Sequence, residues 1–102
     1  DEAVFTIGPY TFQPTNKLLL NMVENKKVRL TDKEAAILKY LCRAGDRTVG
    51  RDALLDEVWG YSTDVTTHTL ETHVYRLRQK IEDDPSSAQI LVTAPGGYRL
   101  VP

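Results

Sequence analysis

One predicted helix constrains the fold of this chain more than any other feature. Four apolar residues in the second half of the sequence are spaced four, three and four positions apart, so they form one stripe along a helix of about residues 67–81. The stripe consists of Leu70, Val74, Leu77 and Ile81. Pro85 follows shortly after and ends the pattern, because proline cannot continue a helix. The chain must therefore bury this stripe and leave the opposite helix face outside.

Two shorter helices are predicted before this one. Thr31 and Glu34 have the spacing of a capping box, in which each side chain bonds to the other residue's backbone amide, and Gly45 supplies the stop. A second helix is expected over residues 51–59, with Gly60 at its end.

The other segments predict strands. Residues 1–30 contain short extended segments separated by turn-forming residues, which predict an antiparallel sheet of about four strands. Apolar runs at residues 90–93 and 98–101 flank the turn sequence Ala94-Pro95-Gly96-Gly97 and predict a β-hairpin. Together these elements predict an α+β fold, a winged helix-turn-helix with an N-terminal four-stranded antiparallel sheet, three helices and a C-terminal β-hairpin wing.

Composition favours one small soluble domain. Of the 102 residues, 41% are hydrophobic, enough for a modest core. The single cysteine, Cys42, excludes an internal disulfide and is expected to be a packed thiol. The longest apolar run, Leu18-Leu19-Leu20, is too short to span a membrane. The formal net charge of −1 argues mildly against a nucleic-acid partner.

The distribution of charge argues the other way. The segment from His73 to Lys80 carries Arg76, Arg78 and Lys80 and no acid, and a binding surface responds to the potential within about 10 Å rather than to the total. The residues expected to point most directly outward are His68, Thr72, Tyr75 and Gln79, with Arg76 beside them. Arginine and glutamine suit base edges in a DNA major groove, whereas lysine, threonine and a second arginine suit phosphates. A solvated helix face is the alternative, but the Glu/Lys pairs four apart that are typical of one are missing.

Three segments together resemble one protein family. They are residues 51–60 with Val58-Trp59-Gly60, residues 65–81 with the pattern of His73, Leu77 and Arg78, and the terminal Gly96-Gly97-Tyr98-Arg99. In these the chain resembles the OmpR/PhoB family, the DNA-binding output domains of two-component response regulators. The N-terminal sheet also fits that family, so the resemblance covers nearly the whole chain.

The resemblance implies roles for individual residues. It makes Arg76 the best candidate for a base contact, with Glu71 and Thr72 at neighbouring groove-facing positions. The positions implied to contact the DNA backbone are Arg51, Trp59, His68, Thr69, His73, Tyr75, Arg78, Thr93 and Tyr98. The segment implied to contact RNA polymerase is the loop of Gly60, Tyr61, Ser62, Thr63, Asp64, Val65 and Thr66. For Trp59 a partly buried anchor, and for Tyr98 simple packing of the hairpin, are the alternatives.

The chain departs from the family pattern in two places. The wing tip, Ala94-Pro95-Gly96-Gly97, lacks the arginine that relatives often insert into the minor groove, although Arg99 lies close by. His68 and Tyr75 stand where many relatives have arginine. We therefore expect a shallower salt dependence of DNA binding than in relatives, since the slope scales with the number of neutralised phosphates.

Other function classes fit less well. An enzyme is not expected, because the sequence lacks a nucleophile beside a base, a glycine-rich phosphate loop and a carboxylate pair. No cofactor or metal is expected; His68 and His73 are five positions apart, whereas a zinc helix motif needs four. The serious alternative is a winged helix used mainly for protein–protein contact, through its sheet edge or the loop at residues 60–66.

The resemblance also implies a wider context. Residues 1–102 are expected to be one DNA-binding effector domain, with a phosphorylatable receiver domain upstream and outside this chain. The implied partners are promoter double-stranded DNA with direct repeats, a second copy on that DNA, RNA polymerase, the receiver domain and its sensor kinase. No membrane partner is implied, and the expected location is the cytoplasm.

Overall fold

The computed structural model describes residues 4–60 and 65–101. The chain begins with a four-stranded antiparallel sheet in the order β1-β2-β3-β4, as the sequence predicts. Its strands are β1 (Phe5–Ile7), β2 (Tyr10–Gln13), β3 (Leu18–Asn21) and β4 (Lys26–Arg29). Before β4 the chain turns at Asn21, whose side chain accepts hydrogen bonds from the amides of Val23 and Glu24.

The three helices have the predicted bounds. Helix α1 (Asp32–Ala44) begins with the predicted capping box of Thr31 and Glu34 and ends at Gly45, whose φ is 71°. Helix α2 (Arg51–Trp59) has Gly50 as an N-cap without a side-chain hydrogen bond. Helix α3 (Thr67–Ile81) is the helix predicted from the apolar stripe.

The C-terminal hairpin belongs to a second, three-stranded sheet in the order β5-β7-β6. Strands β6 (Leu91–Ala94) and β7 (Gly97–Leu100) form the predicted wing. Strand β5 (Val49–Gly50) and the 3₁₀ turn η1 (Pro85–Ser87) are additional elements that the sequence reading missed. A two-residue strand shows no alternation of its own, so periodicity alone does not reveal β5.

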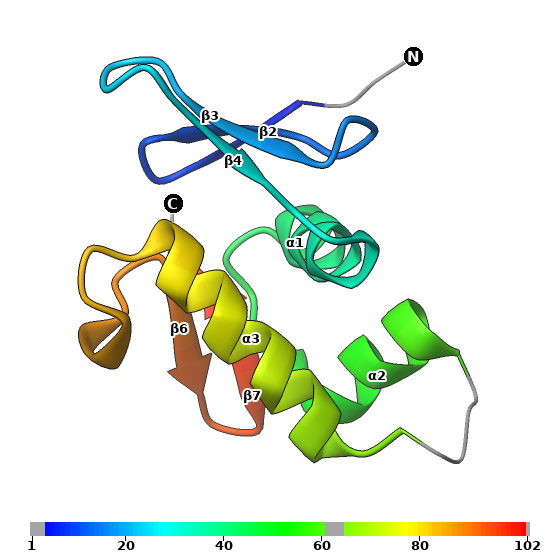
Figure 1. Ribbon diagram of the computed structural model, residues 1–102. Coiled ribbons are helices and arrows are strands. Elements are labelled where there is room, and N and C mark those ends of the chain that lie inside the picture. Colours follow the sequence, from blue (N-terminus) through cyan, green and yellow to red (C-terminus); the bar gives the residue numbers. More distant parts are fainter. Residues whose placement is uncertain (1–3, 61–64, 102) are drawn as a thin grey trace.

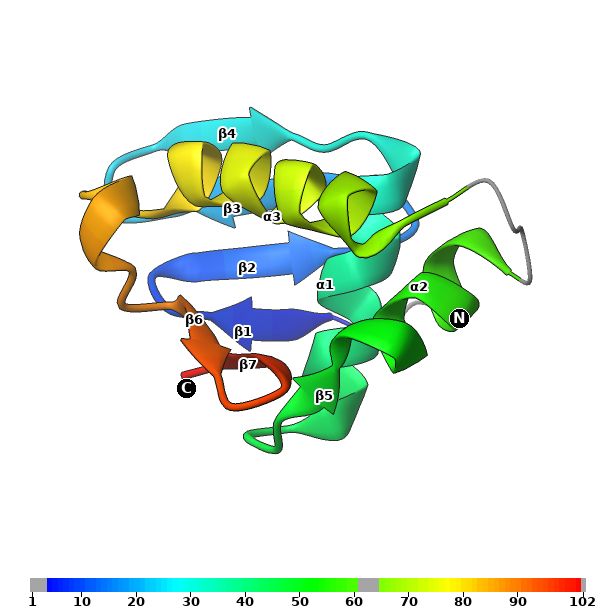
Figure 2. The same cartoon turned by 90° about the horizontal axis from the view of Figure 1, so that it is seen from below.

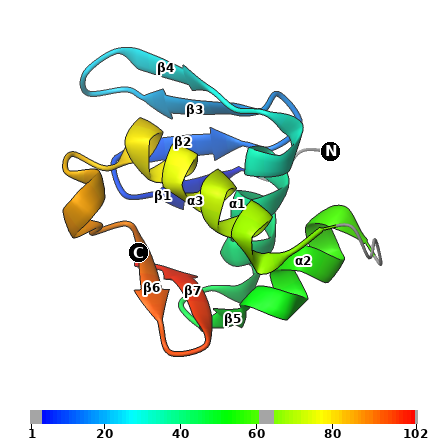
Figure 3. The same ribbon diagram turned by 60° about the horizontal axis from the view of Figure 1, so that its bottom comes forward.

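The core joins the N-terminal sheet to the helices. All four stripe residues of α3 are buried, as are Phe12 and Leu19 of the sheet and Ile37, Leu38 and Leu41 of α1. In Figure 1 the four-stranded sheet lies above the helices, and α2 and the tip of the hairpin lie farthest below it. The β6–β7 hairpin projects beside α3 (Figures 1 and 3). The predicted winged helix-turn-helix is confirmed.

Among the described helices, none has both the length and the apolar character needed to cross a membrane.

Candidate nucleic-acid interface

The outward face of α3 is polar and accessible. His68, Glu71, Tyr75, Arg76 and Gln79 are exposed, and 58% of Tyr75 is accessible. Thr72 is half-buried and its hydroxyl donates to the carbonyl of His68 one turn earlier. Figure 2 shows α3 in full view, with α2 and the hairpin on different sides of it. The helical projection thus identified the exposed face correctly.

Lys80 does not belong to the outward cationic face that the sequence predicts. Its Nζ donates to Oε1 of Glu34 at 2.6 Å and to the carbonyl oxygen of Arg29 at 3.1 Å. Burial alone would raise the pKa of Glu34, but the hydrogen bonds from Lys80 and Thr31 outweigh it and hold that pKa below its ordinary value. The partly exposed ammonium group therefore holds α3 to α1 and β4 and does not add to the outward cationic face.

Arg78 connects α3 to the wing. Its Nε donates to the carbonyl oxygen of Leu91 at 2.9 Å, and its Nη2 donates to Oγ1 of Thr93 at 2.8 Å. The resemblance implies that Arg78 and Thr93 both contact the DNA backbone, and the structure brings the two side chains together at β6, one residue pair before the end of the hairpin. A phosphate contact there would involve a group already oriented by the protein.

Glu82 is a structural residue that the sequence reading missed. It is buried, and its two carboxylate oxygens accept hydrogen bonds from the backbone amides of Gln89, Ile90 and Leu91. Leu91 is thus held at its amide by Glu82 and at its carbonyl by Arg78. In the sequence Glu82 is the first of three consecutive acidic residues, a pattern typical of the solvated end of a helix. No local signal therefore shows that Glu82 is buried and the other two are not.

Arg51, Tyr98 and Glu71 meet where α2, the wing and α3 come together. The Arg51 Cζ lies 5.0 Å from the centre of the Tyr98 ring, and the Arg78 Cζ lies 5.7 Å from it. Tyr98 is only 3% exposed, so its ring supports the two guanidinium groups, as the packing interpretation expects. Arg51 Nε is 3.8 Å from Oε2 of Glu71.

Trp59 is a half-buried anchor between helices. Its ring meets the His73 ring edge-on, with centroids 5.0 Å apart, and the Lys33 Nζ lies 5.5 Å from its centre. His73 Nδ1 in turn is 2.8 Å from the carbonyl oxygen of Thr69. These contacts agree with the anchor interpretation and hold the ring of His73, a residue implied to face the DNA backbone.

The loop before α3 and the wing tip are the remaining predicted parts of the interface. Of the loop implied to contact RNA polymerase, Gly60, Val65 and Thr66 are described, whereas residues 61–64 lie outside the described part of the chain. Ala94 pairs with Gly97, so the wing turn consists of Pro95 and Gly96, with Gly96 at φ 83°. The tip therefore carries no cation, as the sequence predicts.

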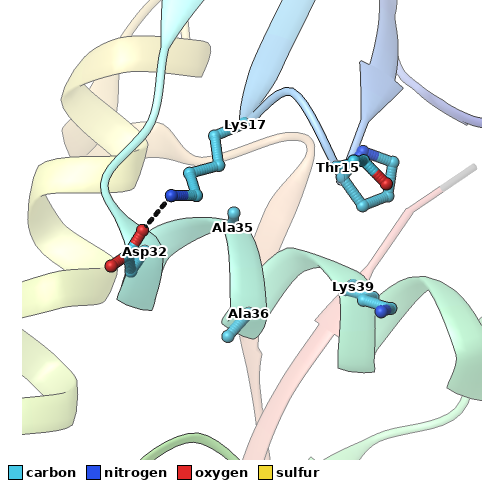
Figure 4. Close-up of a pocket in the computed structure, with 7 residues that line it drawn as sticks. Thr15, Lys17, Asp32, Ala35, Ala36 and Lys39 are labelled. Carbon is cyan, nitrogen blue, oxygen red and sulfur yellow. Dashed lines mark ion pairs between the residues drawn. The ribbon is translucent and has the colours of Figure 1, made fainter.

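Two of the cavities in the described part of the chain border helix α1. A groove of about 500 Å³ runs between the start of α1 and α3, and Arg76, Gln79 and Lys80 are among its lining residues. A smaller pocket between the β2–β3 turn and α1 is lined by an ion pair of Lys17 and Asp32 together with small side chains (Figure 4). No group of three histidine, cysteine or acidic side chains in the described segments could hold a metal ion.

The sequence profile of the family described as "Transcriptional regulatory protein, C terminal" matches residues 25–100. The chain belongs to this family. The match covers α1, α2, α3 and the wing, which together make up the surface described above, and it confirms the resemblance to the OmpR/PhoB family.

Other proteins with this domain support the assignment. The chain is 43% identical over 100 residues to the transcriptional regulatory protein KdpE of Mycobacterium tuberculosis, covering 97% of this chain and 43% of KdpE. It is 39% identical over 101 residues to the sensory transduction protein RegX3 of Mycolicibacterium smegmatis, covering 98% of this chain and 43% of RegX3. The chain thus spans less than half the length of these curated relatives.

Solved structures share the fold. The response regulator DrrB of Thermotoga maritima, described as an OmpR/PhoB homologue, superimposes with a TM-score of 0.84 at 26% identity, covering 97% of this chain and 44% of DrrB. The DNA-binding domain of Klebsiella pneumoniae RstA, solved with an RstA box, gives a TM-score of 0.79 at 23% identity, covering 95% of each chain. At that identity the RstA likeness concerns the fold alone.

Proposed function

We propose that this domain binds specific double-stranded DNA sequences and serves as the output domain of a two-component transcription regulator. The observation that carries the proposal is the exposed polar face of α3, with Arg76 on it and the hairpin beside it. A helix of this kind fits the major groove of B-DNA, and an adjacent hairpin can follow the backbone. Membership of a transcription-regulator family supports the same function.

In this proposal Arg76 is the principal base contact, because an exposed guanidinium can form two parallel hydrogen bonds with guanine. Glu71 and Thr72 lie one turn earlier on the same helix and face the neighbouring bases. The backbone contacts come from α2, from both flanks of α3 and from the wing. They are Arg51, Trp59, His68, Thr69, His73, Tyr75, Arg78 and Thr93, with Tyr98 acting through the two arginines that it supports.

Replacing Arg76 tests the proposal against a role in protein–protein contact. Sites bound by the wild-type domain are selected from random DNA, and the affinity of wild type and Arg76→Ala is measured by electrophoretic shift. We expect Arg76→Ala to weaken binding to the selected site by about 1–3 kcal/mol and to relax the base preference at one position.

Arg43→Ala is the matched control, because Arg43 is an exposed arginine in the last turn of α1 and its loss changes the net charge equally. Its affinity should stay close to that of wild type. Failure to select any site would contradict the DNA-binding function itself. Equal binding by wild type and Arg76→Ala would show that Arg76 does not contact the DNA.

The wider context follows from the same family relationship. We propose that a receiver domain controlled by a sensor kinase precedes this domain in the intact protein, and that two copies bind direct repeats in a promoter. We further propose that the loop at residues 60–66 contacts RNA polymerase and that the protein acts in the cytoplasm. The relatives, of which this domain covers less than half, support a longer protein of this kind.

A further inference from the structure

Glu71 lies next to Arg51, the cation that contacts a phosphate in the proposed DNA complex. Its Oε2 is 3.8 Å from Nε of Arg51, and half of its side chain is exposed on the outward face of α3. Arg51 is held from another side, since its guanidinium lies 5.0 Å from the centre of the buried Tyr98 ring. Arg51 therefore lies between an aromatic ring and a carboxylate of the same protein, and the carboxylate offsets part of its charge.

The start of α2 favours a phosphate beside Arg51, although the exposed Asp52 in the same first turn opposes one. Helix α2 begins at Arg51, and its N-cap, Gly50, makes no side-chain hydrogen bond to the amides of the first turn. A helix N-terminus carries a partial positive charge, which adds to that of the guanidinium. In the protein without DNA, the carboxylate of Glu71 is the negative group paired with Arg51.

We infer that Glu71 competes with DNA phosphates for Arg51 and in this way acts as a specificity-determining residue; the inference rests on the DNA binding proposed above. On any duplex, a phosphate that reaches Arg51 also approaches the Glu71 carboxylate, and the repulsion between the two anions weakens the contact. Where the facing base is cytosine, the carboxylate accepts a hydrogen bond from the exocyclic amino group in the major groove. The Arg51–phosphate contact is therefore fully favourable only at the correct sequence.

The charge-neutral variant Glu71→Gln separates this role from that of an ordinary base contact. Fluorescence anisotropy measures its affinity, over a range of salt concentrations, for a duplex selected by the wild-type domain and for a scrambled duplex of the same composition. We expect Glu71→Gln to bind the scrambled duplex about two- to fivefold more tightly, the range expected for releasing one exposed ion pair. The slope of log affinity against log salt on that duplex should steepen by about one, as for one more neutralised phosphate. The ratio of selected to scrambled affinity should fall.

Two further variants tie the effect to Arg51. In an Arg51→Gln background, Glu71→Gln should no longer tighten binding, because no cation remains to be released. Glu57→Gln removes the same charge from an exposed position on α2 and should change the affinity for the scrambled duplex by less than Glu71→Gln does.

The outcomes distinguish this inference from the proposed function. Wild-type binding to the selected duplex together with an unchanged or weakened Glu71→Gln complex on the scrambled duplex would overturn the role of Glu71 and leave DNA binding intact. Equal tightening with and without Arg51 would overturn it as well, by reducing the effect to overall charge. Absence of wild-type binding to any duplex would overturn the proposed function and this inference with it.

Discussion

The ion pair between Lys80 and Glu34 sets how α3 lies against the rest of the protein. Glu34 is 2% exposed and closes the capping box of α1, while Lys80 also donates to the last residue of β4. Replacing Lys80 by Met removes the charge, keeps most of the chain length and leaves a buried carboxylate with one partner fewer. We expect Lys80→Met to lower the free energy of unfolding by about 1–2 kcal/mol at neutral pH, less than a fully buried pair because Lys80 is partly exposed.

The pH dependence of this loss follows from the pKa of Glu34. That pKa is lowered in the folded protein, so the stabilisation is present above the ordinary carboxyl pKa and disappears as the pH falls through the lowered value. Urea unfolding of wild type and Lys80→Met should therefore give a difference in the free energy of unfolding that shrinks as the pH falls below the ordinary carboxyl range. Lys39→Met, an exposed lysine of α1, is the control and should cost little at either pH. A difference that stays constant with pH would contradict the assignment to Glu34.

At the scale of single residues, the sequence predicted which side of a helix is buried but not which distant side chains interact. The spacing of Leu70, Val74, Leu77 and Ile81 identified the buried side of α3, and the opposite side is exposed as expected. It did not reveal that Lys80 pairs with Glu34, which is 46 positions away, or that Glu82 binds three amides of the wing segment. Periodicity is a local property of one helix, whereas these partners depend on how distant segments pack.

At the scale of elements, local signals predicted the helices and missed the strand that connects them to the wing. The capping box and the terminal glycines act within a few residues, so the helix bounds could be read from the sequence. Strand β5 exists because Val49 and Gly50 pair with Tyr98 and Gly97 of the hairpin. Such a pairing requires a tertiary contact that no short window of sequence contains.

Gly97 is the residue that allows this pairing. A Cβ atom at Gly97 would lie 1.9 Å from the carbonyl oxygen of Val49, so an alanine there must push β5 and β7 apart. We expect Gly97→Ala to lower the free energy of unfolding by about 2–3 kcal/mol, the cost of overpacking a close backbone contact. Gly50→Ala is the matched control across the same pair: its φ is −66° and the nearest atom to an added Cβ is 3.9 Å away. Similar chemical denaturation midpoints for the two variants would contradict the close-contact explanation.

At the scale of the whole molecule, the net charge of −1 misled about the kind of partner and bears instead on the strength of binding. Several cations close to α3 already contact other groups of the same chain. Lys80 pairs with Glu34, Lys33 donates to the carbonyl of Val58, Arg78 holds the wing and Arg51 faces Glu71. The wing tip adds no cation. Few positive charges thus remain to displace counterions from DNA.

The salt dependence of DNA binding should report this limited number of cations. Each neutralised phosphate contributes about 0.9 to the slope of log affinity against log salt, so a domain with few free cations should give a shallower slope than a homologue with arginine at the positions of His68 and Tyr75. Anisotropy titrations of the isolated domain on one half-site, between about 50 and 200 mM salt, measure it directly. A slope as steep as that of a homologue with arginine at the positions of His68 and Tyr75 would show that cations now paired inside the protein turn to the phosphates on binding. A shallow slope would instead make the domain depend on its directed base contacts, and on a second copy, to discriminate its site from bulk DNA.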